Sequence, residues 1–176
     1  MTATTTTDAI VQVGALATEY SLTIWNFAGD SLIIIVPVLI FFAFARSEGR
    51  GPFVAVLLSF YCAYALYLTF PYASFLPTAP ALTALLAQVG LYFALTLVFY
   101  LILRRVVVSD FLYIGILGLI ILSFLATAFL IALAYHIFPV AAVYNFTPAL
   151  DALFAAKAYF WWWFAAPAIG LFFLAR

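Results

Sequence analysis

Two long apolar runs dominate the hydropathy pattern of this chain. They cover residues 81–103 and 111–138, and a short polar joint with Arg104, Arg105 and Asp110 separates them. Each run exceeds the roughly 20 apolar residues that a helix rising about 1.5 Å per residue needs to cross about 30 Å of hydrocarbon. An arginine at the centre of a membrane helix costs about 2.5–3.5 kcal/mol on insertion scales, so the joint should lie at a membrane surface. The pattern therefore predicts a transmembrane hairpin.

Further apolar runs on both sides of this hairpin predict additional spans. The first run ends at Arg46, and a polar, glycine-containing turn leads to Pro52, a residue suited to the first position of a helix. Near the C-terminus, Thr147 is a predicted N-cap, with Pro148 at the first helical position and Asp151 in the first turn. The predicted spans cover about residues 25–45, 53–70, 81–103, 111–138 and 157–175.

The first 24 residues follow a different pattern. Residues 1–7 form a threonine-rich, uncharged tail, and apolar positions recur every three or four residues over 8–24. This spacing predicts an amphipathic helix that lies in the membrane interface. No basic residue precedes Arg46, so we expect no signal peptide. We interpret 1–24 as tail plus interfacial helix and 25–176 as one transmembrane domain.

Composition agrees with a membrane protein. Of the 176 residues, 70% are hydrophobic and only 7% are charged, whereas a soluble domain carries about 25% charged residues. The apolar residues come in blocks, which favours helices over a barrel. The net charge is zero, so the electrostatic basis for binding nucleic acid is missing. We predict an all-α, polytopic integral membrane bundle of about five transmembrane helices in a lipid bilayer.

Basic residues gather at one set of span ends, which predicts the orientation of the chain. The other set holds a single basic residue, Lys157, together with Asp8, Glu19, Asp30 and Asp151. The basic residues of the first set are Arg46, Arg50, Arg104, Arg105 and Arg176. Because cytoplasmic loops are enriched in Lys and Arg, we predict a cytoplasmic C-terminus and an N-terminus outside.

Residue types that carry catalysis or bind metals are sparse. His136 is the only histidine and falls at the end of the fourth span, where we expect an interfacial ring rather than a proton relay. Cys62 is the only cysteine and lies inside an apolar run, where we expect a small buried residue. The serines have no sequence-near base and are expected to bond their own helices. We predict no enzyme, no cofactor and no metal site.

Glycines and prolines inside the spans predict local features of the helices. Pro37 and Pro167 each remove one backbone hydrogen bond, so we expect kinks there. Gly115 and Gly118 lie three residues apart on the fourth span. We expect them to allow close contact with a neighbouring helix rather than to form a hinge.

Three tyrosines form a stripe on the second span. Tyr61, Tyr64 and Tyr67 recur every three residues, which places them on one side of a helix. Their hydroxyls need partners in lipid, so the stripe predicts an inward face rather than a cofactor site.

Asp30 and Lys157 are the charges that fall well inside predicted spans. At 1.5 Å per residue, Asp30 lies about 24 Å from Arg46 and Lys157 about 28 Å from Arg176, so the two should reach similar depths. A pair inside the bundle would satisfy both charges. Alternatively, each side chain reaches the interface independently, with Asp151 as the nearer companion of Lys157.

The layout resembles the colicin V production protein family over about residues 29–139. The resemblance rests on the acidic Asp30 in Asp-Ser-Leu-Ile-Ile-Ile, the Arg/Gly turn at 46–51, the basic joint after the third span, and Gly115 and Gly118 in Ile-Gly-Ile-Leu-Gly. Family glycines are usually four apart rather than three, and the N-terminus and the aromatic fifth span fall outside the pattern. The resemblance implies a bacterial inner-membrane protein with a role in export or envelope homeostasis and without assigned catalytic residues.

Two functions remain open from the sequence. One is a small multi-pass protein of the bacterial cytoplasmic membrane that supports transport or export, as an oligomeric channel or an accessory factor. The alternative is a non-catalytic structural subunit or anchor of a larger membrane complex. Either function implies association with further copies of the chain or with other membrane proteins.

Overall fold

The computed structural model describes residues 29, 31–71, 75–106, 114–144 and 146–174, and within these residues the regular elements are all helical. Three helices are long and apolar enough to cross a membrane: α2 (Arg50–Leu68), α3 (Ala81–Val106) and α4 (Ile116–His136). The remaining elements are a shorter apolar helix Ser31–Ser47, the 3-10 turn η3 (Val140–Ala142), α5 (Pro148–Phe154) and α6 (Lys157–Leu174). The predicted amphipathic helix over 8–24, Asp30 and Arg176 lie outside the described residues.

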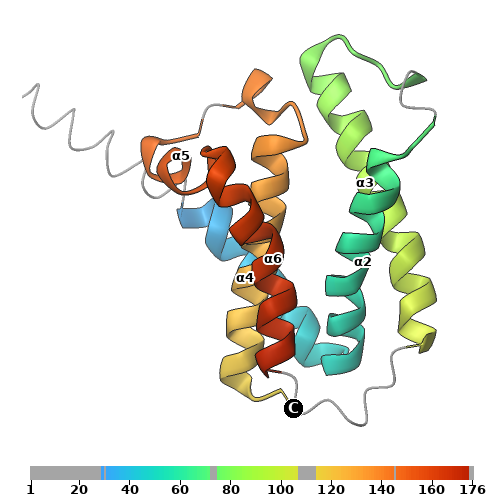
Figure 1. Cartoon of the computed structure of the whole chain (residues 1–176), viewed down its shortest axis with the longest axis vertical. Coiled ribbons are helices and arrows are strands. Elements are labelled where there is room, and N and C mark those ends of the chain that lie inside the picture. Colours follow the sequence, from blue (N-terminus) through green and yellow to red (C-terminus); the bar gives the residue numbers. More distant parts are fainter. Residues whose placement is uncertain (1–28, 30, 72–74, 107–113, 145, 175–176) are drawn as a thin grey trace, which may run out of the picture.

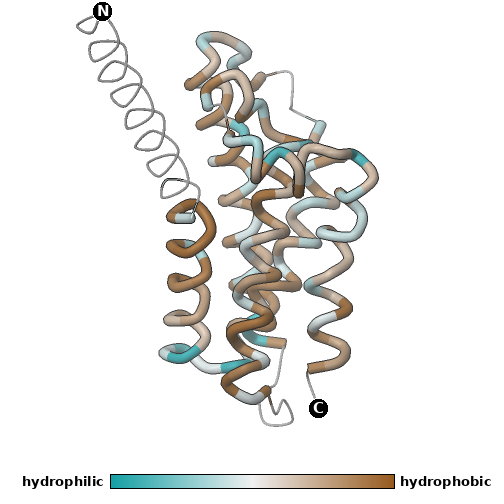
Figure 2. Tube along the Cα trace, turned by 90° about the vertical axis from the view of Figure 1, so that its left-hand side faces the viewer, coloured by the Kyte–Doolittle hydropathy of each residue, from teal (hydrophilic) through white to brown (hydrophobic). Residues whose placement is uncertain are grey.

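The helices form two closely packed pairs. α2 and α3 make an antiparallel hairpin, and α4 packs along α6 (Figure 1). The Ser31–Ser47 helix enters the bundle through Ala45 and through Phe41, whose ring meets Phe60 of α2 at 5.9 Å. Figure 2 shows hydrophobic residues along the helices and a hydrophilic turn between Ser31–Ser47 and α2. This distribution is the one expected of helices that cross an apolar layer.

Three of the five predicted spans coincide with α2, α3 and α4. The first predicted span contains the Ser31–Ser47 helix, which belongs to the shorter class of apolar helices. α6 has 18 residues, but its first half holds Lys157, Tyr159 and three tryptophans, which lower its mean hydropathy. The described chain is therefore an all-α protein with three helices suited to spanning a membrane.

The starts of α2 and α4 differ from the predicted span boundaries. α2 begins at Arg50, because the turn closes at Gly49 with φ of 100°, a left-handed conformation that favours glycine. Pro52 is consequently the third helical residue and not the first. Gly115, in an ordinary extended conformation, is the N-cap of α4, which starts at Ile116. The Ser31–Ser47 helix is assigned without interruption through Pro37.

The helix-start pattern at Thr147 marks a short separate helix. Thr147 occupies the N-cap and Pro148 the first position of α5, as predicted, and Asp151 lies in its first turn. The Thr147 hydroxyl makes no capping hydrogen bond and is buried without a partner in the described part of the chain. The chain leaves the helix after seven residues and begins α6 at Lys157.

Glycines set the approach of α4 to α6. A Cβ on Gly118 would lie 3.8 Å from the Cβ of Leu174, and one on Gly170 would lie 2.6 Å from Cδ1 of Leu125. Such small residues let helix backbones come close in a membrane. Gly115, in contrast, has open space where a Cβ would be built. Its role is at the N-cap of α4 rather than in helix packing.

Candidate functional site

The tyrosine stripe of α2 faces the rest of the bundle, as its spacing predicts. The rings of Tyr61 and Tyr64 lie 5.2 and 5.1 Å from the ring of Phe164 on α6. Towards the other end of α2, Tyr67 meets Tyr92 of α3 at 6.2 Å and Phe138 at 5.7 Å. The stripe therefore joins the α2–α3 hairpin to the α4–α6 pair.

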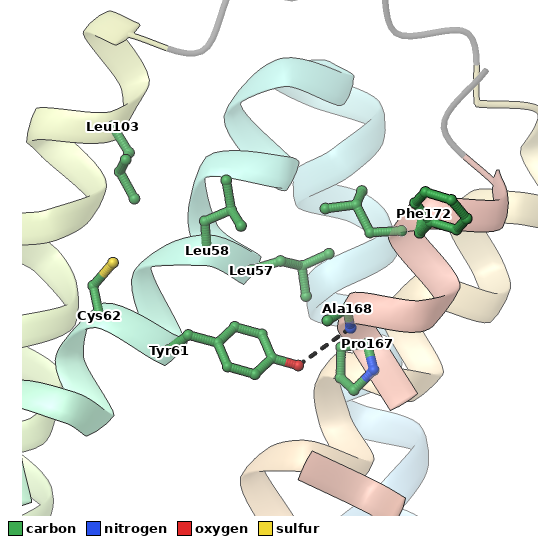
Figure 3. Close-up of a pocket in the computed structure, with 9 residues that line it drawn as sticks. Leu57, Leu58, Tyr61, Cys62, Leu103, Pro167, Ala168 and Phe172 are labelled. Carbon is green, nitrogen blue, oxygen red and sulfur yellow. Dashed lines mark hydrogen bonds between the residues drawn. The ribbon is translucent and has the colours of Figure 1, made fainter. Parts of the chain in front are cut away.

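Tyr61 makes an unusual contact with the backbone of α6. Its hydroxyl donates to the carbonyl oxygen of Phe164 at 2.7 Å. It also accepts from the N–H of Ala168 at 3.2 Å, the hydrogen bond that Figure 3 shows. In an uninterrupted α-helix these two backbone groups pair with each other. Pro167, between them in sequence, has no N–H and distorts a helix interior. The hydroxyl thus satisfies both backbone groups at the point where proline weakens the helix.

Phe129 is the centre of the aromatic contact among α2, α4 and α6. It is 1% exposed, and its ring lies 5.9 Å from Phe60, 5.0 Å from Tyr61 and 5.4 Å from Phe164. One α4 side chain therefore touches aromatic residues of both neighbouring helices. Offset and tilted ring pairs of this kind contribute about 0.5–1.5 kcal/mol each beyond their burial.

An apolar groove of about 690 Å³ lies beside this contact, between α2, α3 and α6. Its lining consists of Leu57, Leu58, Tyr61, Cys62, Leu103, Pro167, Ala168, Leu171 and Phe172. Figure 3 shows the α2 and α6 side chains opposite each other, with Leu103 of α3 on a third side. The groove suits an alkyl chain or another apolar group. Cys62 is half-buried on its wall, which corrects the expectation of a fully buried thiol.

His136 ties the end of α4 to the segment that follows. Its Nε2 lies 2.9 Å from the carbonyl oxygen of Phe154, and its ring meets Phe160 edge-on at 5.0 Å. With Nε2 protonated, the ring donates this hydrogen bond. The geometry accounts for His136 as a structural link between α4, α5 and α6.

Asp151 and Lys157 lie at this end of the bundle and do not pair with each other. Asp151 accepts a hydrogen bond at 2.7 Å from the hydroxyl of Tyr135. Lys157 is exposed at the first position of α6 and makes no ion pair with another described residue. The proposed pair of Lys157 with Asp30 involves a residue outside the described part of the chain and stays a prediction.

Four arginines lie at the opposite end of the bundle. Arg104 at the end of α3 forms an ion pair of 3.0 Å with Glu48 in the turn before α2. This contact brings Arg104 and its neighbour Arg105 to the same end as Arg46 and Arg50, which flank that turn. Both partners of the ion pair are about half exposed, so it contributes little to stability.

Metal-ligand clusters and the serine hydroxyls can be checked among the residues that the structure describes. No group of three or more His, Cys, Asp or Glu could hold a metal there. Ser59 and Ser123 each donate at 2.7 Å to a carbonyl of their own helix, Val56 and Leu119 respectively. Both hydroxyls are thus engaged with their own helix, as predicted.

Comparison with known proteins leaves the resemblance to the colicin V production family untested. The chain matches no protein-family model, no curated protein and no solved structure.

Proposed function

We propose that the protein is a five-span integral membrane protein and a non-catalytic accessory or anchoring subunit of a larger membrane assembly. The observation that supports this function is that one side of α3 is exposed and apolar. This helix packs mainly on α2, and most of its remaining surface faces away from the described bundle. A membrane-crossing helix with one free side is well placed to bind a helix of another protein.

The free side of α3 carries a continuous apolar stripe. Its exposed large side chains include Leu82, Leu86, Val89, Phe93, Leu97 and Leu101. Gly90 lies on the same side, and a Cβ built there would have no atom within 4 Å. Glycine inside a helix costs about 1 kcal/mol relative to alanine, and no contact in the described bundle requires it here. A glycine at position 90 would allow the backbone of a partner helix to approach α3 closely.

A photo-crosslinking amino acid at Leu97 tests the docking of α3. We expect an adduct with another membrane protein or a second copy, identified by its mass, and no adduct from the same group at Tyr92, which is 5% exposed. Gly90→Leu should abolish the protein adduct without lowering the melting temperature, because the added side chain faces open space and leucine favours a helix. Adducts with lipid alone at Leu97 would reject the proposal.

Support of transport or export is the second candidate function. It is favoured by the proline-weakened segment of α6 beside a laterally open groove, since bending at Pro167 would change the width of the groove. Reconstitution into liposomes tests this candidate. An absence of solute flux, both alone and with co-purified partners, would count against it.

The proposed topology places the arginine end in the cytoplasm and the N-terminus outside. In a Cys62→Ser background, a membrane-impermeant maleimide added to intact cells should label a cysteine at Ala141 and not one at Ser47. The two positions are exposed at opposite ends of the bundle, so each serves as the control of the other. If only Ser47→Cys is labelled, the orientation is the opposite of the proposed one. If both cysteines are labelled in intact cells, the chain has no fixed orientation.

A further inference from the structure

A small aromatic cavity with one carboxylate lies between the end of α4 and the start of α5. It has a volume of about 150 Å³ and is lined by Tyr135, Ala141, Tyr144, Phe146 and Asp151. The Phe146 ring stacks on Tyr135 at 4.4 Å, and Tyr144 stands edge-on to Phe146 at 5.2 Å, with 76° between the ring planes. Aromatic rings at such angles, with a negative charge beside them, are suited to an organic cation.

The carboxylate is held in place but keeps binding capacity. Asp151 uses Oδ1 to accept the Tyr135 hydroxyl hydrogen at 2.7 Å. A carboxylate offers about four acceptor positions, so this single bond leaves most of them available. No cation among the described residues forms an ion pair with Asp151. The charge on this wall of the cavity is therefore not neutralised by a neighbouring side chain.

An alkyl-lined cavity adjoins the aromatic one. It has a volume of about 210 Å³, and Phe146 belongs to the walls of both cavities. Its other walls are Ile33 and Pro37 of the Ser31–Ser47 helix and Thr127, Leu130, Ile131 and Ala134 of α4. The Thr127 hydroxyl donates within α4 to the carbonyl of Ser123 at 3.0 Å. This second cavity thus presents an apolar surface to an occupant.

The two cavities together match an amphiphile. Along α4, Ala134 lines the apolar cavity and the next residue, Tyr135, lines the aromatic one. We propose that this region binds a lipid with an organic ammonium headgroup, whose cation lies against Asp151, Tyr144 and Phe146 and whose alkyl chain lies between α4 and the Ser31–Ser47 helix. Charge complementarity selects the headgroup, and the apolar cavity selects a chain-bearing molecule over a free ammonium ion. This site is separate from the α3 surface and does not depend on the proposed function.

Native mass spectrometry of the full chain in neutral detergent tests the proposal. The probes are phosphatidylcholine and phosphatidylglycerol with identical acyl chains, offered at equal concentration. We expect phosphatidylcholine to bind about fivefold more tightly, the preference that one cation–π contact provides. Asp151→Asn should remove this preference, because it deletes the charge while retaining an oxygen acceptor for Tyr135. Tyr144→Leu should weaken it by removing a ring.

Matched controls separate this site from general electrostatics. Glu48→Gln removes one carboxylate at the arginine end and should leave the preference unchanged. Ala134→Trp, which fills the apolar cavity, should weaken phosphatidylcholine binding but not the binding of free choline. Equal binding of the two lipids by the unmodified protein, or an undiminished preference in both Asp151→Asn and Tyr144→Leu, would overturn the proposal. A third outcome is tight binding of choline that Ala134→Trp leaves unchanged, together with no preference between the two lipids. This result would assign the site to a free organic cation and overturn the proposal that it binds an amphiphile.

Discussion

Phe129→Ala is expected to destabilise the folded protein by about 3 kcal/mol, near the lower end of the range for buried aromatic truncations. The ring is 1% exposed and contacts Phe60, Tyr61 and Phe164. Within a bilayer the unfolded reference still surrounds residue 129 with apolar groups, so the transfer contribution is smaller than in water. The cavity left among three helices supplies the remaining loss. The measurement is unfolding in mixed micelles titrated with a denaturing detergent.

The same substitution at Phe93 provides the control. Phe93 is 66% exposed on the free side of α3, so Phe93→Ala should change the free energy of unfolding of the isolated protein by less than about 0.5 kcal/mol, as is usual for surface positions. Equal losses at the two positions would mean that Phe129 is not the centre of the contact between the helix pairs. A small loss at Phe129 would mean that its neighbours collapse into the space.

The membrane-spanning helices were predictable where the sequence holds a long, uninterrupted apolar run. The apolar runs that became α3 and α4 exceed the roughly 20 residues that a bilayer requires, and the run of α2 comes close to it. This length is a property of each segment alone. Their ends were less predictable, since backbone geometry decides them. Gly49 adopts a left-handed conformation that allows α2 to begin before Pro52, and α6 is divided from α5 after Phe154. Neither feature changes the hydropathy pattern.

The faces along which the helices meet were not predictable from hydropathy. A helix that is apolar on all sides has no polar face to point away from its neighbours. The inward face of the tyrosine stripe was predictable because hydroxyls need partners: Tyr61 bonds the backbone of α6 and Tyr67 bonds Gln88 of α3. Tyr64 lies on the same side by its spacing and contributes its ring. Phe129 and Gly170 carry no such requirement, so their positions at the contacts of α4 emerge only in three dimensions.

The candidate cation site was likewise not predictable from hydropathy or spacing. Asp151 stood out in the sequence as a first-turn acid and as a companion for Lys157, whereas the structure gives it a hydrogen bond from Tyr135. The residues of the cavity come from α4, η3, α5 and the connection between them. Such a cluster has no spacing of its own in the sequence. The concentration of Tyr144 and Phe146 just before Asp151 is the local feature that could have indicated it.

Tyr61→Phe is expected to cost about 1–2 kcal/mol of stability, the sum of two modest hydrogen bonds in a membrane protein. The substitution keeps the ring and removes the hydroxyl that donates to Phe164 and accepts from Ala168. Tyr64→Phe is the matched control. Its ring meets the same Phe164 at 5.1 Å, and its hydroxyl makes no hydrogen bond within the described bundle. It should therefore change the free energy of unfolding by only a few tenths of a kcal/mol.

A double-mutant cycle with Pro167→Ala decides whether the Tyr61 hydroxyl compensates for the proline. Alanine removes the ring that clashes with the Trp163 carbonyl and supplies the N–H that bonds it. The next turn can then become regular, so that Ala168 and Phe164 pair with each other. In that background Tyr61→Phe should cost less than it does alone, and the coupling should reach about 0.5 kcal/mol or more, the size found for residues that share one network. Additive losses would show that the hydroxyl only joins α2 to α6. A coupling of the expected sign would instead identify α6 as a helix whose turn at Pro167 is stabilised by a side chain of α2. Loss of the Tyr61 contact would then let α6 bend at Pro167 and widen the groove beside it.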